Sequence, residues 1–272
     1  MTTQTRLTDT HALARFRARS DKGALFLQES AADEIEDRLS LVNRAFTTPA
    51  VVTPFPDLWA KRIDTARIVP DDDVLDLAPG AHDLVIYAMS LHWANDPVGQ
   101  LIQVRRSLKP DGLMICASLG GQTLEELRAC LGEAEIAVSG GLSPRVVPMG
   151  EIRDLGALLQ RAGFALPVAD SVTLNTEYRD ARHLMHDLQR MGESNALAIR
   201  NKATPSRRLF EEASKIYAQN FPGQNGRVKA TFEMVFLTGW APDESQQKPL
   251  RPGSAKQRLA DALSVPETPL RD

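Results

Sequence analysis

A histidine and a tryptophan follow the most apolar segment of the chain, at a place where side chains can do chemistry. His92 and Trp93 come shortly after Asp83–Ala88 (DLVIYA), whose near-continuous apolar run predicts a parallel strand buried on both faces. In open α/β sheets, ligands bind beyond the carboxyl ends of such strands. We therefore take His92 as a candidate catalytic residue and Trp93 as a candidate wall of the site. The alternatives are a turn cap for His92 and core packing for Trp93.

An arginine beyond a glycine pair is a second candidate. Arg145 follows the loop 140–144 (GGLSP), which we expect at the rim of a pocket. Its guanidinium can hold a carboxylate or phosphate through two parallel hydrogen bonds. A structural salt bridge is the alternative role for Arg145.

Two histidines and a carboxylate raise the question of a metal. His183 and His186 lie three residues apart on an expected helix, with Asp187 beside them, and two histidines with one carboxylate can bind non-haem iron. His186 and Asp187 are adjacent, however, so they point about 100° apart on a helix and share a metal poorly. We expect an amphipathic lid helix here and no metal site.

Alternating strands and helices must position these residues. Apolar runs predict strands at 50–52, 67–69, 73–77, 83–88, 113–119, 166–178 and 228–237, and helical periodicity predicts helices at 29–46, 58–63, 96–108 and 151–161. Thr123 and Glu126 form a capping-box pattern that starts one more helix. The pattern predicts an α/β fold, a Rossmann-like sheet flanked by helices with a helical lid insertion.

The expected domain organisation follows from these elements. Residues 1–46 form an N-terminal helical region, and residues 47–240 form the main domain, with the helical insertion at about 181–220. Residues 241–272 form a polar, basic tail.

Two segments carry a resemblance to a known family. Ala81–Trp93 (AHDLVIYAMSLHW) resembles the fourth-strand signature of the type 11 class I methyltransferases, which use S-adenosylmethionine (SAM), and Arg106–Leu113 (RSLKPDGL) looks like the turn before their fifth strand. The resemblance implies a class I methyltransferase fold, reduced in size here, and a SAM site. Its candidate residues are Thr53, Asp71, Asp72, Ala88, Met89, His92 and Trp93. Asp71 or Asp72 would take the ribose hydroxyls, with a solvated acidic turn as the alternative.

The downstream half is similar to one branch of that family. Asp154–Phe164 and Val228–Glu233 resemble the malonyl-carrier-protein methyltransferases. Ser245–Ala255 resembles the complex I assembly factors of methyltransferase fold, a mitochondrial group with alphaproteobacterial relatives. This resemblance implies a client protein from a respiratory complex. It also implies arginine hydroxylation, for which His183 and His186 are the only metal candidates.

The glycine-rich turn that holds SAM in class I methyltransferases is missing. No glycine occurs between Gly23 and Gly80, and the loop after the expected first strand is Thr53–Pro56 (TPFP). Two prolines remove two N–H donors and hold φ negative, so this loop cannot copy a glycine turn. We expect the Phe55 ring to occupy ligand space, which argues against ordinary SAM binding while leaving SAM a possible cofactor.

Charge and composition exclude several classes of protein. The 272 residues include 32 basic and 35 acidic ones, for a net charge of −3, so we expect no nucleic-acid partner. Cys116 and Cys130 lack ligand spacing, and no apolar run is long enough to span a membrane. Asp9 and Asp21 make the arginine-containing N-terminus unlike a transit peptide, so we expect a cytoplasmic protein. A partner contact is expected for the basic tail residues Lys248, Arg251, Lys256 and Arg258.

Three functions follow. The first is a SAM-dependent methyltransferase-family protein acting on a small-molecule or protein substrate, although its degraded cofactor loop argues against ordinary methyl transfer. The second is a non-catalytic assembly factor whose cleft holds a respiratory-complex client protein. The third is an activity like that of the protein arginine hydroxylases. The missing glycines favour the second function, and the retained fourth-strand segment favours the first.

Overall fold

The computed structural model describes residues 6–247 of the chain. The chain divides into two units, Met1–Pro242 and Asp243–Asp272. All the helices and strands described below belong to the first unit, and only residues 243–247 of the second are described. The basic tail residues, from Lys248 onward, therefore lie outside the described residues, as does most of Ser245–Ala255.

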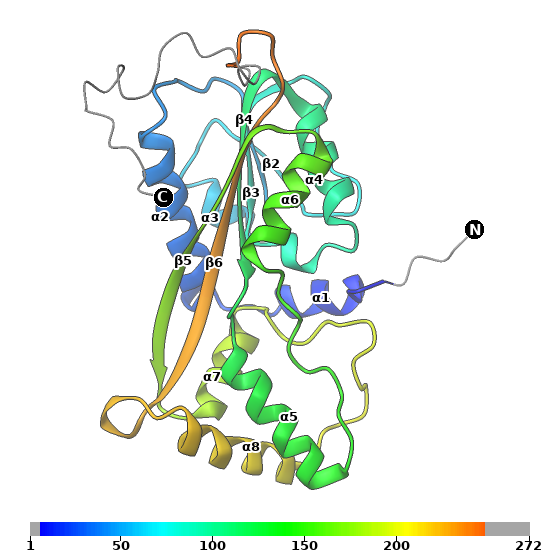
Figure 1. The fold of residues 1–272 in the computed structure, drawn as a ribbon, viewed down its shortest axis with the longest axis vertical. Helices are drawn as coiled ribbons and strands as arrows, with labels where there is room; N and C mark the ends of the chain where they lie inside the picture. Colours follow the sequence, from blue (N-terminus) through cyan, green and yellow to red (C-terminus); the bar gives the residue numbers. More distant parts are fainter. Residues whose placement is uncertain (1–5, 248–272) are drawn as a thin grey trace, which may run out of the picture. The chain divides into compact units, whose positions relative to one another are not determined.

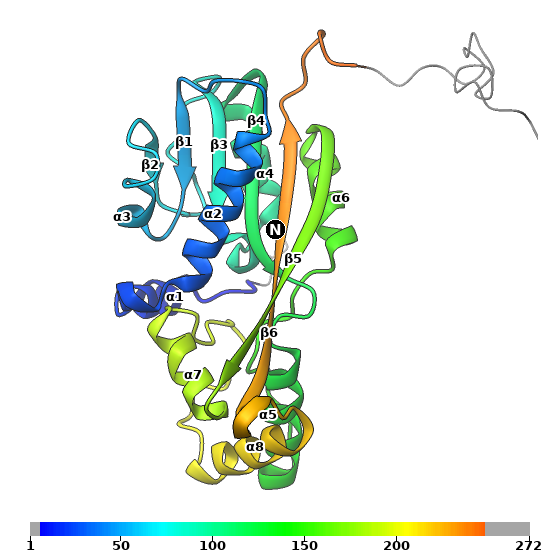
Figure 2. The same ribbon diagram turned by 90° about the vertical axis from the view of Figure 1, so that its left-hand side faces the viewer.

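Six strands form one mixed sheet (Figures 1 and 2). They are β1 (Pro49–Val52), β2 (Arg67–Val69), β3 (His82–Ala88), β4 (Leu108–Gly120), β5 (Ala165–Tyr178) and β6 (Val228–Trp240). Their order across the sheet is β2-β1-β3-β4-β6-β5. The first four in this order run parallel, whereas β6 is antiparallel to both β4 and β5. The parallel half confirms the expected Rossmann-like arrangement.

The apolar character of the central strands explains their position. All seven residues of β3 and all four residues of β1 are buried. The register places Val51 beside Ile86, and Ile86 beside Ile115 of β4. Because apolar side chains leave both faces of these strands, both faces must be covered.

Eight α-helices accompany the sheet in the described residues. They are α1 (Thr10–Arg17), α2 (Phe26–Ser40), α3 (Pro56–Trp59), α4 (Pro97–Ser107), α5 (Glu125–Ser139), α6 (Ile152–Ala162), α7 (Ala181–Arg190) and α8 (Arg207–Asn220). On one face, Ile35 of α2 shares an apolar core with Val51. On the other, Leu101 of α4 and Leu159 of α6 share a core with Val85. Within residues 6–247, no helix combines the length and the apolar character needed to cross a membrane.

Helices α5, α7 and α8 gather beyond the carboxyl ends of the parallel strands, and we call these three helices the lid (Figure 2). The expected insertion at 181–220 is present as α7 and α8, and α5 packs against α8. The ribbon formed by β5 and β6 extends from the sheet to the lid (Figure 2). The lid is therefore tied to the sheet by strands as well as by loops.

The segment 73–77, expected to be a strand, is irregular. Only Leu75 in it is fully buried, whereas Val74 is 80% exposed. The side chain of Gln103 on α4 holds the segment instead, because its oxygen accepts a hydrogen bond from Leu75 N at 2.9 Å and its nitrogen donates to Asp73 O at 3.0 Å. These side-chain hydrogen bonds replace those of a strand ladder.

Two helix starts also differ from the prediction. α2 runs over Phe26–Ser40 rather than 29–46. The capping box does not form, since α5 begins at Glu125 and Thr123 Oγ1 donates to Glu233 O on β6. Glu126 accepts a hydrogen bond from Thr231, also on β6. Contacts with a distant strand thus replace the local cap.

A buried carboxylate fixes the start of β1 against β3. Asp83 Oδ2 accepts hydrogen bonds from Thr47 N at 2.7 Å and Thr47 Oγ1 at 2.8 Å, and Oδ1 accepts one from Thr48 N at 2.9 Å. Burial alone would raise the pKa of Asp83, but these hydrogen bonds outweigh it and lower the pKa to about 2. Asp83 is therefore ionised at neutral pH.

Candidate functional site

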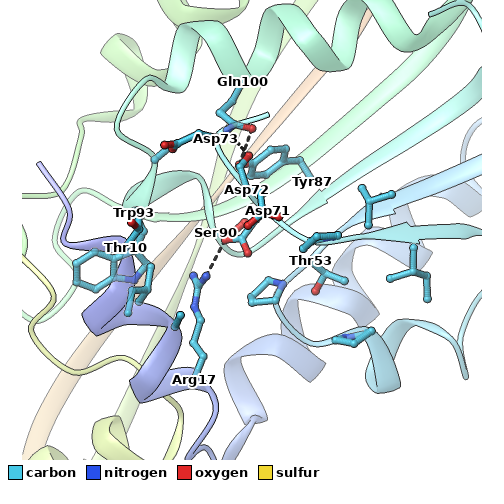
Figure 3. A pocket seen from close by; sticks show the side chains of 18 of the residues that line it. Thr10, Arg17, Thr53, Asp71, Asp72, Asp73, Tyr87, Ser90, Trp93 and Gln100 are labelled. Atoms are coloured by element: carbon cyan, nitrogen blue, oxygen red, sulfur yellow. Dashed lines mark hydrogen bonds and ion pairs between the residues drawn. The ribbon is translucent and has the colours of Figure 1, made fainter. Parts of the chain in front are cut away.

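A cleft opens at the carboxyl ends of β1, β2 and β3, the edge where open α/β sheets bind ligands (Figure 3). Its volume is about 530 Å³, and each strand supplies a residue to its wall: Thr53 follows β1, Asp71 follows β2 and Ser90 follows β3. Arg17 of α1 and Trp93 also line it. We call it the strand-end cleft.

The turn after β1 offers no backbone donor to a ligand in this cleft. Thr53 N donates to Val69 O at 3.0 Å, and Phe55 N donates to Thr53 Oγ1 at 3.1 Å. The two remaining positions, Pro54 and Pro56, have no N–H group. A glycine turn binds its ligand through such N–H groups, and here every one is either used or missing.

The Phe55 ring does not enter the strand-end cleft, contrary to our expectation. The side chain is buried and lines a neighbouring hollow together with Leu25 and Leu58. Thr53 and Pro54 face the cleft in its place. The space at the strand ends is therefore open.

An arginine from α1 engages the acidic residue that follows β2. Arg17 Nη1 lies 2.7 Å from Asp71 Oδ2, and the two side chains are only 10% and 15% exposed. In Figure 3 the Arg17 side chain points from α1 toward Asp71. Arg17 Nε and Nη2 are buried without a hydrogen-bond partner among the described residues. One of the two predicted ribose acids is thus already paired, whereas Asp72 is exposed at the cleft wall.

The strand-end cleft gathers only part of the predicted SAM site. Thr53, Asp71, Asp72 and Trp93 line it. Ala88, Met89 and His92 are not among its lining residues. The sequence did not indicate four further residues that line the cleft, which are Arg17, Tyr87, Ser90 and Gln100.

His92 and Trp93 converge on the carboxylate of Glu193, which lies three residues beyond the end of α7. Trp93 Nε1 donates to Glu193 Oε2 at 2.7 Å, and His92 Nε2 lies 3.4 Å from the same oxygen. The His92 side chain is 4% exposed, and its Nδ1 lies 3.4 Å from Ser118 Oγ. Burial would raise the pKa of Glu193, but the hydrogen bonds from His92 and Trp93 and the charge of Arg17 lower it overall. Glu193 is therefore ionised although buried.

A second cavity, of about 540 Å³, lies between the lid and the end of the sheet, and we call it the lid chamber. Glu193 and Trp93 line it, and Trp93 lines the strand-end cleft as well. Arg145 also lines the chamber, where its Nη2 lies 2.6 Å and its Nε 3.2 Å from the carboxylate oxygens of Glu135. Arg145 therefore makes the structural salt bridge that the sequence left as the alternative.

The histidine pair on α7 belongs to no cluster of three or more potential metal ligands among residues 6–247. His183 and His186 are exposed, and the ring of His183 packs edge-on against Tyr178, with 5.7 Å between centroids. Asp187 accepts a hydrogen bond from the Tyr178 hydroxyl at 3.2 Å. Across residues 6–247, no group of three or more His, Cys, Asp or Glu side chains could hold a metal ion.

The sheet and the strand-end cleft define a protein of class I methyltransferase fold, and comparison with known proteins agrees. A family model described as a methyltransferase domain matches residues 56–116. The chain is 37% identical over 225 residues to the Danio rerio arginine-hydroxylase NDUFAF5, mitochondrial, covering 83% of this chain and 70% of that protein. The chain belongs to the methyltransferase-fold family of the NDUFAF5 proteins.

Other relatives connect this family to the methyltransferases. The human arginine-hydroxylase NDUFAF5, mitochondrial, is 40% identical over 193 residues, which are 71% of this chain and 56% of the human protein. The malonyl-[acyl-carrier protein] O-methyltransferase of Laribacter hongkongensis is 33% identical over 188 residues, 69% of this chain and 61% of that enzyme. The chain spans 44% to 62% of four further NDUFAF5 relatives, one of which is the human protein.

Solved structures show more distant similarity. The YcgJ protein of Bacillus subtilis has a TM-score of 0.49 at 11% identity, with 78% of this chain and 98% of that chain covered. The phosphoethanolamine N-methyltransferase 2 of Haemonchus contortus, in complex with SAM, has a TM-score of 0.39 at 12% identity, with 78% and 52% covered.

The prediction of a cytoplasmic protein is wrong on this comparison. The NDUFAF5 relatives from Danio rerio, Dictyostelium discoideum and Homo sapiens are each named as mitochondrial. The acidic residues that made the N-terminus unlike a transit peptide belong to the folded unit: Asp9 caps α1, and Asp21 pairs with Arg190.

Proposed function

We propose that this chain acts on an arginine of a respiratory-complex client protein, as a hydroxylase and assembly factor of the NDUFAF5 type. The observation that carries the proposal is the 37% identity to a protein named arginine-hydroxylase, which extends over 83% of this chain. The resemblance of the sequence to complex I assembly factors supplies the class of client.

The residues around the strand-end cleft fit SAM poorly, which favours this function over ordinary methyl transfer. The turn at Thr53–Pro56 has no N–H group to offer a ligand. Asp71, at the place where the acid for the ribose is expected, is paired with Arg17. Methyl transfer from SAM is therefore not part of the proposed reaction.

Hydroxylation of an arginine requires dioxygen and a reductant as co-substrates. A C–H bond of the arginine side chain is replaced by C–OH, with one oxygen atom taken from dioxygen. The second oxygen atom leaves as water, so a reductant must supply two electrons and two protons. In this proposal, the chain's own residues bind and orient the client arginine and shield it from bulk water.

Peptide mass mapping of complex I tests the proposal. The gene is deleted in its source organism and restored on a plasmid, and the arginine peptides of purified complex I are compared. We expect one arginine to carry the mass of an added oxygen atom in the wild-type and restored strains and to be unmodified in the deletion strain. An unchanged arginine map would contradict the proposal.

Methyl transfer is the second candidate function, because the methyltransferase-domain match covers residues 56–116, which include β2 and β3 at the cleft. The same mapping separates the two functions. Loss of a methylene mass, rather than of an oxygen mass, in the deletion strain would favour methyl transfer.

A further inference from the structure

We propose that the lid chamber binds an aliphatic side chain that ends in a cation, either a guanidinium or an ammonium group, and that Glu193 accepts the hydrogen bonds of this cation. The inference rests on the proposed function, since it adds the place where a client side chain enters and the residue that recognises it. The chamber, of about 540 Å³, is large enough for an arginine or lysine side chain.

The wall of the chamber suits the methylene stem of such a side chain. Apolar side chains contribute most of it, and those from α5, α7 and α8 are Leu127, Leu131, Met185, Leu188 and Phe210. Lysine and arginine bury their methylene groups along apolar surface while the charged head reaches a polar partner. A small polar or acidic ligand would lose its hydration in this chamber without gaining such contacts.

The charges around the chamber favour a positive ligand. Three charged residues line it, and two are already neutralised: Arg145 by Glu135, and Arg200 by Asp9, whose Oδ2 lies 2.9 Å from Arg200 Nη2. Glu193 supplies the third charge and is the only carboxylate among the described residues of the wall. An interface selects partners of complementary charge, so a cation is the favoured occupant.

Glu193 has one carboxylate oxygen engaged and one available. Oε2 accepts the hydrogen bond from Trp93 Nε1 and faces His92 Nε2. In the part of the chain that the structure describes, nothing donates a hydrogen bond to Oε1. The Glu193 side chain is 10% exposed, and Oε1 is not among the buried atoms that lack a partner, so Oε1 is open to solvent and can accept a hydrogen bond from a ligand. Guanidinium and ammonium groups donate strong, charge-assisted hydrogen bonds to such an oxygen.

The backbone holds Glu193 in position. The chain leaves α7 through Gly192, whose φ of +83° lies in the left-handed region that glycine adopts without strain. Glu193 N then donates to Leu188 O at 2.9 Å, which closes the end of the helix. A Cβ at position 192 would meet Arg17 Cα at 3.1 Å, so α1 packs closely against this turn. A carboxylate held in this way loses little freedom when it binds.

Three blocked amino acids serve as probes for the full-length protein. They are the N-acetyl methylamides of arginine, of lysine and of citrulline, the last being an uncharged analogue of arginine. The indole N–H resonance of Trp93, assigned with Trp93→Phe, reports binding because that group donates to Glu193. We expect a saturable shift with the arginine probe, the lysine probe or both, which identifies the cation. We expect a much weaker response from the citrulline probe.

Glu193→Gln tests the role of the charge. It keeps an oxygen that accepts from Trp93 but removes the negative charge, so we expect affinity for the cationic probe to fall about tenfold or more. Glu211→Gln is the matched control, since Glu211 is exposed on α8 and pairs with Arg182 outside the chamber. Its affinity should equal that of the wild type.

Glu193→Asp covers the case in which the glutamine variant does not fold. It keeps the charge but withdraws it by one methylene group. If both variants fold, we expect its affinity to lie between those of the wild type and of Glu193→Gln. If only the aspartate variant folds, we expect its affinity to be below that of the wild type. Unchanged affinity in the folded variants, equal binding of citrulline, or no saturable shift with either cationic probe would overturn the inference. The readout is binding and not oxygenation, so the chamber inference and the proposed function can fail independently.

Discussion

Arg17 Nη1 and Asp71 Oδ2 lie 2.7 Å apart and join the N-terminal helix to the segment that follows β2. The pair closes α1 onto the wall of the strand-end cleft (Figure 3). Both side chains are largely buried, and two nitrogen atoms of Arg17 have no other partner among the described residues. Asp71 is therefore the main compensation for a buried positive charge.

Asp71→Asn should destabilise the protein because it leaves the buried Arg17 charge without its counter-ion. We expect the free energy of unfolding to fall by about 3 kcal/mol, the low end of the range for breaking a buried pair. Asp72→Asn is the control, since this exposed carboxylate should change stability by less than about 0.5 kcal/mol. Urea unfolding of both variants measures the difference, and equal effects would show that the ion pair is not important for stability.

Asp83→Asn should cost stability in a pH-dependent way. The pKa of Asp83 is lowered from 3.8 to about 2, so its contribution is fully present above pH 4 and is lost as the pH falls through about 2. At neutral pH, we expect the variant to lose about 2 kcal/mol, at about 1.4 kcal/mol per pKa unit. Unfolding free energies of both proteins between pH 7 and pH 2 measure this, and the gap should narrow as the pH falls. A gap of constant size would contradict the assignment.

Gly163→Ala should destabilise the end of α6. Gly163 has φ of +81° at the C-cap of this helix, and an L-residue in the left-handed region costs about 1 kcal/mol. Gly141→Ala is the matched control, because a Cβ there meets nothing within 4 Å and φ is not positive. Thermal unfolding should show a lower melting temperature for Gly163→Ala alone. A similar loss in both variants would argue against a conformational cause.

Local pattern was enough to predict the parallel strands and the end of α6. The strands at 50–52, 67–69 and 83–88 are short apolar runs between turn residues, and Gly163 follows a helix with clear periodicity. The segment 73–77 has a similar composition but is held by Gln103 on another element. Periodicity describes a segment by itself and cannot show which partner will hold it.

The contacts that shape the two cavities were beyond sequence reasoning. Arg17 and Asp71 are 54 positions apart, and Trp93 and Glu193 are 100 positions apart. Nothing in the local residues marks such pairs, since packing of distant elements brings them together. The missing glycines were visible in the sequence. Only the structure shows the hydrogen bonds that use up the N–H groups of the turn and the position of the Phe55 ring.

We propose that the strand-end cleft does not hold SAM in the ordinary way and that methyl transfer is not the activity. A thermal-shift titration with SAM and S-adenosylhomocysteine tests it most directly. A ligand at a hundred times its dissociation constant adds about 2.7 kcal/mol, and a chain of this size gains about 2–4 °C per kcal/mol. We predict no saturable rise in melting temperature up to millimolar ligand. A clear, saturable rise of several degrees would contradict the claim and make methyl transfer the leading function.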